Sequence, residues 1–235
     1  MNLLLFSDLD RVGADRIRLR DHRLQHLQGV IKASEGDSLR VGEIGGRMGS
    51  AELVKLAPDE ALLDVSLHQA PPNKLPLRLV LALPRPKMLR RILRLVAELG
   101  VPELHLINSY RVEKSYWQTP VLDPAIVEDY FLEGLAQSRD TVLPQVSLHK
   151  RFKPFVEDIL PGLLEDRRGL LAHPGDHPAC PRGLEEPTLL MIGPEGGFIP
   201  YEVDKAAAVG CQAVSLGPRI LRVENAVAAL VSQLY

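Results

Sequence analysis

The chain has 235 residues, of which 46% are hydrophobic and 25% are charged, and its formal net charge is −2. This composition is that of an ordinary globular protein, long enough to bury a core. Two cysteines exclude a disulfide scaffold, and no apolar run approaches the roughly 20 residues that span a bilayer. The N-terminus lacks a basic start and turns acidic at Asp8, unlike a signal peptide, so we expect a cytoplasmic enzyme with no membrane partner.

The charge is unevenly distributed along the chain. Residues 1–120 contain 18 Lys and Arg against 14 Asp and Glu, whereas residues 121–235 contain 10 against 16. A moderately basic first half fits an anionic partner, and it equally fits an ordinary solvated surface.

Residues 1–70 are expected to form a small, mostly β domain. Short runs of alternating polarity at 16–19, 38–41, 50–56 and 61–67 predict strands, and glycine-rich turns separate them, as in a small barrel or sandwich. Residues 21–31 favour a single helix. A strand at 16–19 would present three arginines on one face as a candidate RNA-binding surface: Arg16, Arg18 and Arg20.

A proline-rich linker at 71–76 is expected to separate this domain from a second one at 77–235. The second domain alternates apolar runs with helical patterns, which predicts an α/β fold with a five- or six-stranded, mainly parallel sheet. The expected strands are 77–83, 104–107, 169–172, 189–192 and 213–216, and the expected helices are 87–99, 124–137, 155–164, 201–209 and one from about 222.

The helix expected at 87–99 has two stripes at helical spacing. Its apolar stripe is predicted to contain Met88, Ile92, Leu95 and Leu99. Its basic stripe contains Lys87, Arg90, Arg91 and Arg94. Such a basic stripe is often only a solvated face, but together with the arginines at 16–20 it could bracket a nucleic-acid backbone, with Lys87 and Arg91 as candidate contacts.

Two glycine-containing loops follow the strands at 189–192 and 213–216. The first, Gly193-Pro194-Glu195-Gly196-Gly197, matches no phosphate-binding fingerprint, so it suits a neutral or zwitterionic ligand, and alone it is more often a tight turn. The second, from Leu216 to Arg222, places arginines where a helix begins and fits an anionic partner. Ligands of parallel sheets bind beyond the carboxyl ends of the strands, where both loops lie.

Three potential metal ligands, His173, His177 and Cys180, lie close together after the strand at 169–172. Two prolines lie between the first and the last of these residues, and no fourth ligand is evident, so we expect no metal. We assign this loop to the carboxyl edge of the sheet, where the ligand is expected to bind. Cys211 lies in an apolar context and is expected to be an inert core thiol.

The motifs IGPEGGF at 192–198 and SLGPRILR-x-E at 215–224 resemble the closing region of the ribosomal RNA small subunit methyltransferase E family. That family contains uracil-N3 methyltransferases of the SPOUT superfamily. Ordered matches extend from residue 77 to the C-terminus and include Lys87-Met88, 97–101, Ser109, Arg111, 137–139 and Pro144, while Gly36-Asp37 and Gly45-Gly46 are similar to its PUA-like barrel. The chain departs from the family at Leu95 and at Val223-Glu224-Asn225.

The resemblance implies a C-terminal trefoil-knotted SPOUT domain after a PUA-like β-barrel, a homodimer, small-subunit ribosomal RNA as the partner, and S-adenosylmethionine as the cofactor. The cofactor would be surrounded by backbone of the last loops. The residues expected to bind it are Leu171, His173, Gly193, Pro194, Glu195, Gly196, Leu216, Gly217, Ile220 and Leu221.

The implied reaction is methylation at N3 of a uracil in small-subunit rRNA. Uracil N3 must lose its proton to become nucleophilic, so a cation near O2 or O4 would help, and Arg139 and Arg222 are the candidates. Glu195 is a further candidate for a catalytic role, and Arg111 for RNA binding. Two alternatives stay open: a relative with another target base, and an RNA-binding or assembly factor without activity.

Overall fold

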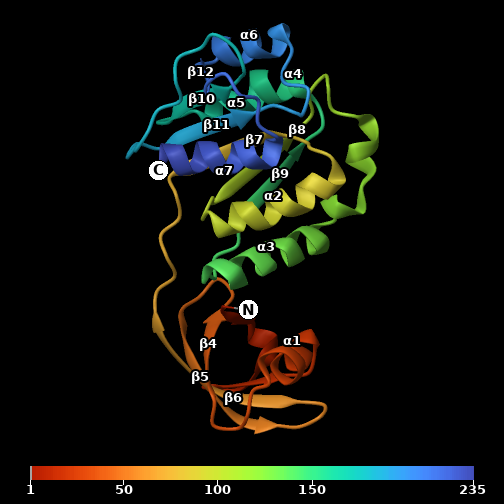
Figure 1. Ribbon diagram of the computed structural model, residues 1–235, viewed down its shortest axis with the longest axis vertical. Coiled ribbons are helices and arrows are strands. Elements are labelled where there is room, and N and C mark those ends of the chain that lie inside the picture. The colour runs from red at the N-terminus through yellow and green to blue at the C-terminus, as the bar shows by residue number, and fades with distance from the viewer. Residues whose placement is uncertain (1) are drawn as a thin grey trace. The chain divides into compact units, whose positions relative to one another are not determined.

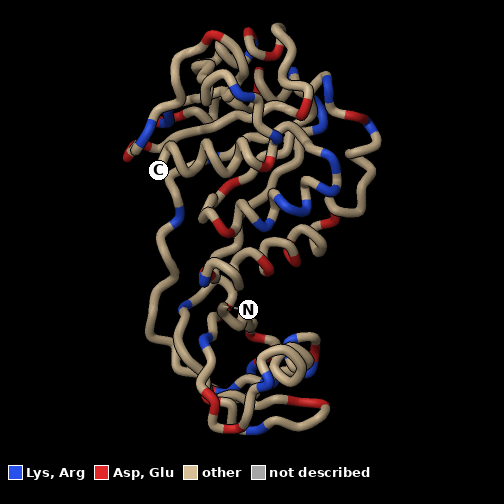
Figure 2. Tube along the Cα trace, viewed as in Figure 1, with Lys and Arg blue, Asp and Glu red and all other residues tan. Residues whose placement is uncertain are grey.

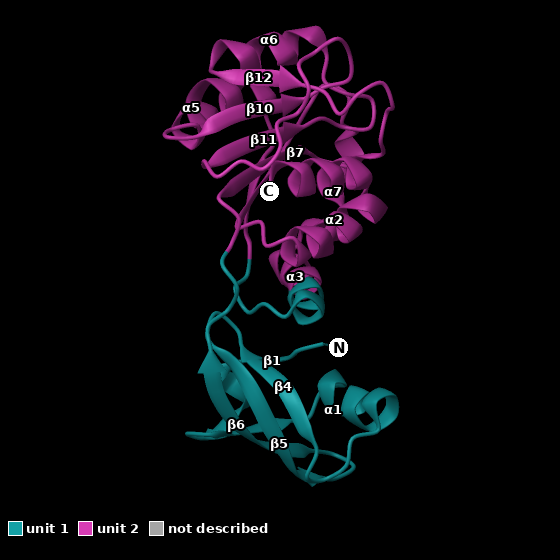
Figure 3. Ribbon diagram, turned by 60° about the vertical axis from the view of Figure 1, so that its left-hand side comes forward, with its two compact units in different colours: residues 1–73, 132–143 teal, residues 74–131, 144–235 magenta. Residues whose placement is uncertain are grey.

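The computed structural model describes residues 2–235 and divides into two compact units. Unit 1 comprises residues 1–73 and 132–143, and unit 2 comprises residues 74–131 and 144–235 (Figure 3). The segment 71–75 contains no helix or strand. From the sequence we expected residues 132–143 to belong to the second domain, whereas in the structure this segment belongs to unit 1.

Backbone hydrogen bonds account for the position of segment 132–143. The amide of Leu3 donates to the carbonyl of Ala136 at 3.0 Å, and the amide of Gly45 donates to the carbonyl of Thr141 at 2.8 Å. The hydroxyl of Thr141 donates to the Gly46 carbonyl at 2.6 Å. These bonds join residues about a hundred positions apart, which no local pattern in the sequence reveals.

Unit 1 is built on a six-stranded mixed sheet in the order β1-β4-β5-β6-β3-β2. β1 pairs with β4 in parallel and the other neighbours are antiparallel. The alternation of polarity places Ile17 and Leu19 in the core and their neighbours outside, as expected. The strands are β1 (Leu4–Phe6), β2 (Arg11–Gly13), β3 (Arg16–Leu19), β4 (Ser38–Glu43), β5 (Met48–Leu56) and β6 (Ala61–Gln69).

The helix expected at 21–31 is two helical segments. α1 (His22–His26) begins at Asp21, whose carboxylate caps it by accepting from the Arg23 amide at 2.9 Å. A π-helical turn then covers Leu27–Ile31 and ends at Lys32, whose φ is 56°. Glycine within this turn, at position 29, weakens the α-helical pattern that the sequence suggested. A 3-10 turn, Asp8–Asp10, completes the helical segments of this part.

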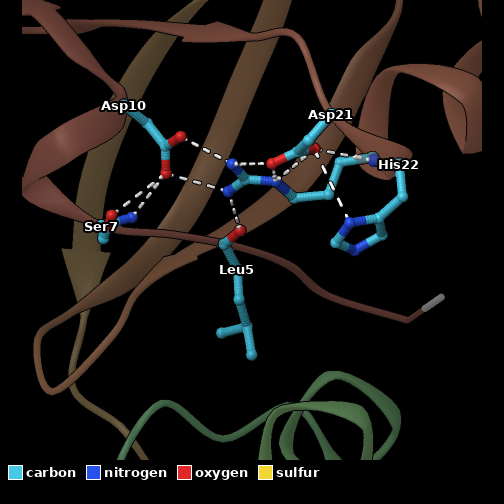
Figure 4. A network of polar contacts seen from close by, with 6 residues as sticks. Leu5, Ser7, Asp10, Asp21 and His22 are labelled. Carbon is cyan, nitrogen blue, oxygen red and sulfur yellow. Dashed lines mark hydrogen bonds and ion pairs between the residues drawn. The ribbon is translucent and has the colours of Figure 1, made fainter. Parts of the chain in front are cut away.

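A partly buried arginine, Arg23, ties α1 to the first strand of unit 1 within the network of polar contacts drawn in Figure 4. The guanidinium of Arg23 donates to both carboxylate oxygens of Asp10, at 2.6 and 2.9 Å, and to the carbonyl of Leu5 at 2.9 Å. It also donates to Asp21 at 2.6 Å. Burial opposes ionisation of Asp10, yet the bonds from Arg23 and the Ser7 amide hold the pKa of this carboxyl below its usual value.

Unit 2 contains a six-stranded sheet in the order β12-β10-β11-β7-β8-β9, in which every pair is parallel. This confirms the predicted parallel sheet. All carboxyl ends therefore lie at one edge. The strands are β7 (Leu77–Ala82), β8 (Glu103–Ile107), β9 (Gln145–His149), β10 (Arg168–Ala172), β11 (Thr188–Ile192) and β12 (Cys211–Val214).

The helices of unit 2 follow the strands as the alternating pattern predicted. α2 packs against α7, which also contacts β11, and α6 contacts β12 (Figure 1). Asp123 caps α3 by accepting from the Ala125 amide at 3.0 Å, as expected. The last residues of α3, from 132, belong to unit 1. The helical segments are α2 (Pro86–Glu98), α3 (Pro124–Ser138), α4 (Phe152–Pro154), a π-turn (Phe155–Ile159), α5 (Leu160–Leu163), α6 (Pro200–Ala208), α7 (Val223–Leu234), and 3-10 turns at Lys114–Gln118 and Pro120–Leu122.

The apolar face predicted for α2 was wrong by about one residue. The side chains that α2 buries are Leu89, Ile92, Leu93, Val96 and Ala97. Met88, Leu95 and Leu99 are only half-buried. Both stripes satisfy a spacing of three or four residues in a leucine-rich helix, so spacing alone did not distinguish them.

The connection between β10 and β11 passes along the outer edge of β12. Ala179 forms a parallel bridge with Ser215, the Cys180 amide donates to the Ser215 carbonyl at 2.8 Å, and the Ser215 amide donates to the Pro178 carbonyl at 2.9 Å. The same connection then bonds the end of α7, because the Leu184 amide donates to the Leu234 carbonyl at 2.6 Å. The chain around β12 is thus held on one side by β10 and on the other by residues 178–180.

Within residues 2–235, no helix has the length and apolar character needed to cross a membrane.

Candidate functional site

A cavity of about 680 Å³ opens at the carboxyl edge of the unit 2 sheet. The chain leaves β10, β11 and β12 at this edge, and the N-terminal ends of α2 and α7 complete the wall. Its volume is that of a pocket for a ligand of nucleoside size. The lining residues are Arg85, Lys87, Met88, Ala172, His173, Pro174, Ile192, Gly193, Pro194, Glu195, Gly197, Val214, Ser215, Leu216, Gly217, Arg219, Ile220, Leu221, Arg222, Val223, Glu224, Ala226 and Leu230.

The loop after β11 is shaped by the close approach of Phe198 to Gly193. A Cβ on Gly193 would lie 3.1 Å from both the ring and the amide nitrogen of Phe198. Phe198 is itself buried, so it can give way only by shifting against its neighbours. The Gly197 amide closes the turn by donating to the Pro194 carbonyl at 2.8 Å. The glycine is therefore required by space at this position, since a larger residue would push the loop out of its present path.

Glu195 contacts the start of α2. Its carboxylate accepts from the Arg85 amide at 3.2 Å, and the Arg85 guanidinium lies 3.9 Å away. Arg85 occupies the N-cap position of α2, where a negative charge is favourable. This contact gives Glu195 a role in holding two walls of the cavity together.

The loop after β12 contributes an apolar rim and two arginines. Gly217 has a φ of 110°, and its amide donates to the Ser215 hydroxyl at 3.1 Å. Such a φ strains any residue with a side chain. Ile220 is 80% exposed, and Leu216 and Leu221 are more than a third exposed although they line the cavity. Arg222 lies on the wall at the N-cap of α7.

His173 lies on the cavity wall, in surroundings that disfavour the protonated imidazole. Burial lowers the pKa of His173, and the neighbouring His177 and Arg111 lower it further. Its Nδ1 is buried and has no hydrogen-bond partner among the described residues. His173 therefore lines the cavity with a ring whose lowered pKa favours the uncharged form.

The histidine and cysteine side chains of this region form no metal centre in the described part of the chain. No group of three or more His, Cys, Asp or Glu side chains could hold a metal ion there. Cys180 and Cys211 are both buried and free, and burial raises the pKa of the Cys211 thiol to about 12. A thiol with that pKa stays protonated and unreactive near neutral pH.

Eight residues expected to bind the cofactor lie on the cavity wall: His173, Gly193, Pro194, Glu195, Leu216, Gly217, Ile220 and Leu221. Leu171 and Gly196 do not line it. Leu171 is buried within β10, and the carbonyl of Gly196 accepts a hydrogen bond from Arg111. Lys87 and Arg222 also reach the cavity, whereas Arg91 is exposed on α2 outside it.

The remaining expected site residues belong to unit 1. Arg139 follows α3 with a φ of 61°. Arg16 and Arg20 are exposed on and after β3, but Arg16 pairs with Asp64 across the sheet and Arg20 pairs with Glu60 at 3.0 Å. Only Arg18 of these three forms no ion pair with a described residue. The predicted basic face is therefore largely neutralised by its neighbours.

One buried carboxylate beside this site was not predicted from the sequence. Glu202 in α6 is 2% exposed and accepts from the Tyr110 amide at 2.8 Å, the Ile199 amide at 3.0 Å and the Ser109 hydroxyl at 3.2 Å. A signal was present, because Pro200 followed by Glu202 marks the first turn of a helix whose glutamate can bond back to the N-cap amide.

Comparison with known proteins assigns the family. Residues 71–235 match the family model described as RNA methyltransferase domain. The ribosomal RNA small subunit methyltransferase E of Treponema pallidum is 32% identical over 97% of this chain and 88% of its own length. The chain belongs to the ribosomal RNA small subunit methyltransferase E family.

Other members of the family are similar along most of the chain. The ribosomal RNA small subunit methyltransferase E of Synechocystis is 30% identical over 93% of this chain and 72% of its own length. A crystal structure of the Neisseria gonorrhoeae methyltransferase E bound to S-adenosyl methionine superposes with a TM-score of 0.77 at 22% identity, covering 98% of this chain and 95% of that one. The likeness shows that the two chains share a fold.

Proposed function

We propose that this protein transfers a methyl group from S-adenosylmethionine to N3 of a uracil in small-subunit ribosomal RNA. Membership of the methyltransferase E family supports the reaction class. The observation that carries the proposal is the cavity of about 680 Å³ at the carboxyl edge of the parallel sheet, walled by both glycine-containing loops. The RNA position and the assignment to N3 rest on the resemblance of these loops to the family.

The residues of the cavity fit S-adenosylmethionine. The cofactor is zwitterionic with a sulfonium and an apolar-faced adenine, and the wall combines apolar side chains with the backbone of the loops that contain Gly193 and Gly217. His173 lies on the cavity wall, and its lowered pKa disfavours a positive charge beside the sulfonium. Leu216, Ile220 and Leu221 would contact the apolar parts of the cofactor.

When bound, S-adenosylmethionine supplies an electrophilic methyl group, so the protein has to orient the base and to stabilise its deprotonated form. Arg222, on the cavity wall, would place a guanidinium beside a uracil oxygen and favour loss of the N3 proton. We retain Arg139 as a second candidate for this role. We assign Glu195 to holding the loop rather than to accepting the proton, because its carboxylate already bonds the Arg85 amide.

The RNA is proposed to reach the cavity along α2. Exposed cations continue from the cavity wall along this helix, namely Arg85, Lys87, Arg90 and Arg91 (Figure 2). Arg90 and Arg91 form no ion pair within residues 2–235, so both are available to phosphates. Arg111 and Arg18 are further proposed contacts. The base would be unpaired or flipped, since N3 is occupied in a Watson–Crick pair.

Three further features are proposed from the family. The contacts of residues 178–184 with Ser215 and Leu234 support a trefoil knot in which the chain around β12 passes beneath the β10–β11 connection. The exposed Ile220 and the apolar rim near it support a homodimer that covers the cavity mouth. The mixed sheet of unit 1 supports a PUA-like barrel that binds RNA. We place the protein in the cytoplasm, where ribosomes are assembled.

The proposal is tested by calorimetry followed by a methyl-transfer assay. The purified protein is expected to bind S-adenosylmethionine with a dissociation constant below about 1 mM. With unmethylated small-subunit rRNA and labelled cofactor, mass mapping is expected to find one new 3-methyluridine. Absence of binding at millimolar cofactor would overturn the enzyme assignment. A methyl group on another base would retain the enzyme and reject the uracil target.

Replacing Arg90 and Arg91 together by glutamine is expected to weaken binding to small-subunit rRNA about tenfold at low salt. Because two phosphate contacts are lost, the slope of log affinity against log salt should decrease in magnitude by about 1–2. Filter binding across a salt series measures both. The matched control is Arg167→Gln with Arg168→Gln, at the amino end of β10, at the opposite edge of the sheet from the cavity. Equal losses in both double variants would reject the path along α2.

A further inference from the structure

The buried carboxylate of Glu202 joins two segments that are far apart in sequence. It lies in the first turn of α6 and accepts from the Ile199 amide of its own segment. Its other two donors, the Tyr110 amide and the Ser109 hydroxyl, come from the loop after β8, more than ninety residues earlier. With 2% of Glu202 exposed, these three donors replace the water that the carboxylate loses on burial.

The loop that Glu202 holds carries Arg111. The residue follows Tyr110 directly, and its guanidinium donates to the carbonyl of Gly196 in the loop after β11. A Cβ on Gly196 would lie 2.9 Å from Cδ of Arg111, so the arginine chain lies directly against this glycine. Arg111 therefore braces the loop whose neighbouring residues, Glu195 and Gly197, line the cavity.

Glu202 also fixes the other end of the same loop. Its bond to the Ile199 amide sets the entry into α6 immediately after Phe198, the buried residue packed against Gly193. One carboxylate thus anchors the loop after β11 at its exit and, through Arg111, at its middle. The exposed Asp204, two residues further along α6, has no comparable position.

We propose that Glu202 is a positioning residue that sets the shape of the cofactor loop Gly193–Phe198 through the β8 loop and Arg111. This inference rests on the proposed function, since it assigns the cavity to S-adenosylmethionine. Glu202 touches neither ligand nor reacting atoms and acts through Arg111 and Ile199. A glutamine at position 202 would keep one acceptor oxygen and place an NH2 donor against the donors that the other oxygen now accepts from, which would loosen the anchors.

The test is a double-mutant cycle in cofactor affinity, measured by calorimetry on the full-length chain with S-adenosylmethionine. Glu202→Gln is expected to weaken binding about tenfold, and Arg111→Ala by a similar factor. In the Arg111→Ala background, Glu202→Gln is expected to weaken binding further by less than about threefold, because the contact of Arg111 with Gly196, through which Glu202 acts, is already absent. Asp204→Asn is the matched control on the same helix and should leave affinity unchanged.

Amide hydrogen exchange separates local positioning by Glu202 from a general loss of stability, because only a general loss would change exchange throughout unit 2. In Glu202→Gln, exchange should become faster at residues 196–199 and 109–111 and stay unchanged in β10 and β11. Should this variant not fold, Ser109→Ala removes one donor only and is expected to give a smaller change, about twofold to threefold, in affinity, with faster exchange in the same segments.

Three results would overturn the inference while the wild-type chain still binds cofactor. They are unchanged affinity in Glu202→Gln, a loss of affinity in the double variant equal to the product of the two single-variant losses, and faster exchange throughout unit 2. Failure of the wild-type chain to bind would instead reject the proposed function. The two failures are therefore distinguishable in the same set of measurements.

Discussion

Gly193→Val is expected to abolish measurable binding of S-adenosylmethionine, with a loss of affinity of about a hundredfold or more. The Cβ alone would lie 3.1 Å from the ring and the amide nitrogen of Phe198, and valine adds two methyl groups at this crowded point. Phe198 is buried, so the strain moves the loop and narrows the cavity. Calorimetry of the variant against the unchanged chain measures the loss.

The control for this prediction is the same substitution at Gly162 in α5. A Cβ there meets no atom within 4 Å, and the residue is exposed in a helical turn. Gly162→Val should therefore bind the cofactor as the unchanged chain does. Retention of near-normal affinity by Gly193→Val would mean that the loop adapts, and would remove this glycine from the proposed cofactor contacts.

Gly49→Ala is expected to reduce the free energy of unfolding by about 3 kcal/mol or more, a large effect for one methyl group. A Cβ at this position would lie 1.9 Å from the carbonyl oxygen of Ser66 and 3.0 Å from Cα of Leu67. Both obstacles are backbone atoms of β6, so relief requires β5 and β6 to separate where the pairing already shifts register. A rotamer change cannot remove such a clash.

Urea unfolding followed by circular dichroism measures this loss, and hydrogen exchange locates it. Exchange in β5 and β6 should become faster than in β10 and β11, and fluorescence of Trp117, the chain's single tryptophan, reports on unit 2. Gly13→Ala is the control within unit 1, because its Cβ would make only an ordinary contact of 3.8 Å with Arg16. A loss below about 1 kcal/mol in Gly49→Ala would contradict the argument.

The sequence predicted the parallel sheet because buried strands such as Leu77–Ala82, apolar except for Arg78, form mostly apolar runs bounded by glycine or proline. It did not predict β9, Gln145–His149, which is at most half-buried at the edge of the sheet. Strands of that kind carry little hydrophobic signal. The short strands β1 and β2 were missed as well.

The candidate site was predictable where it depends on local chemistry and not where it depends on distant contacts. Gly193 and Gly217 were found because glycine after a buried strand marks a backbone that must turn sharply. Glu202 was not found, because its importance comes from Ser109 and Tyr110, which only the folded chain brings to it. The ion pairs of Arg16 and Arg20 were hidden for the same reason.

The edge contact between residues 178–180 and Ser215 has a consequence for biosynthesis. A large part of the cavity wall, from Val214 to Leu230, comes from residues after 210, and the chain around β12 has to enter a space bounded by segments made earlier. A ribosome that is still translating this chain therefore carries no complete cofactor site. We expect the enzyme to acquire its cofactor only after release of the nascent polypeptide, and a chain that stops before α7 to have none.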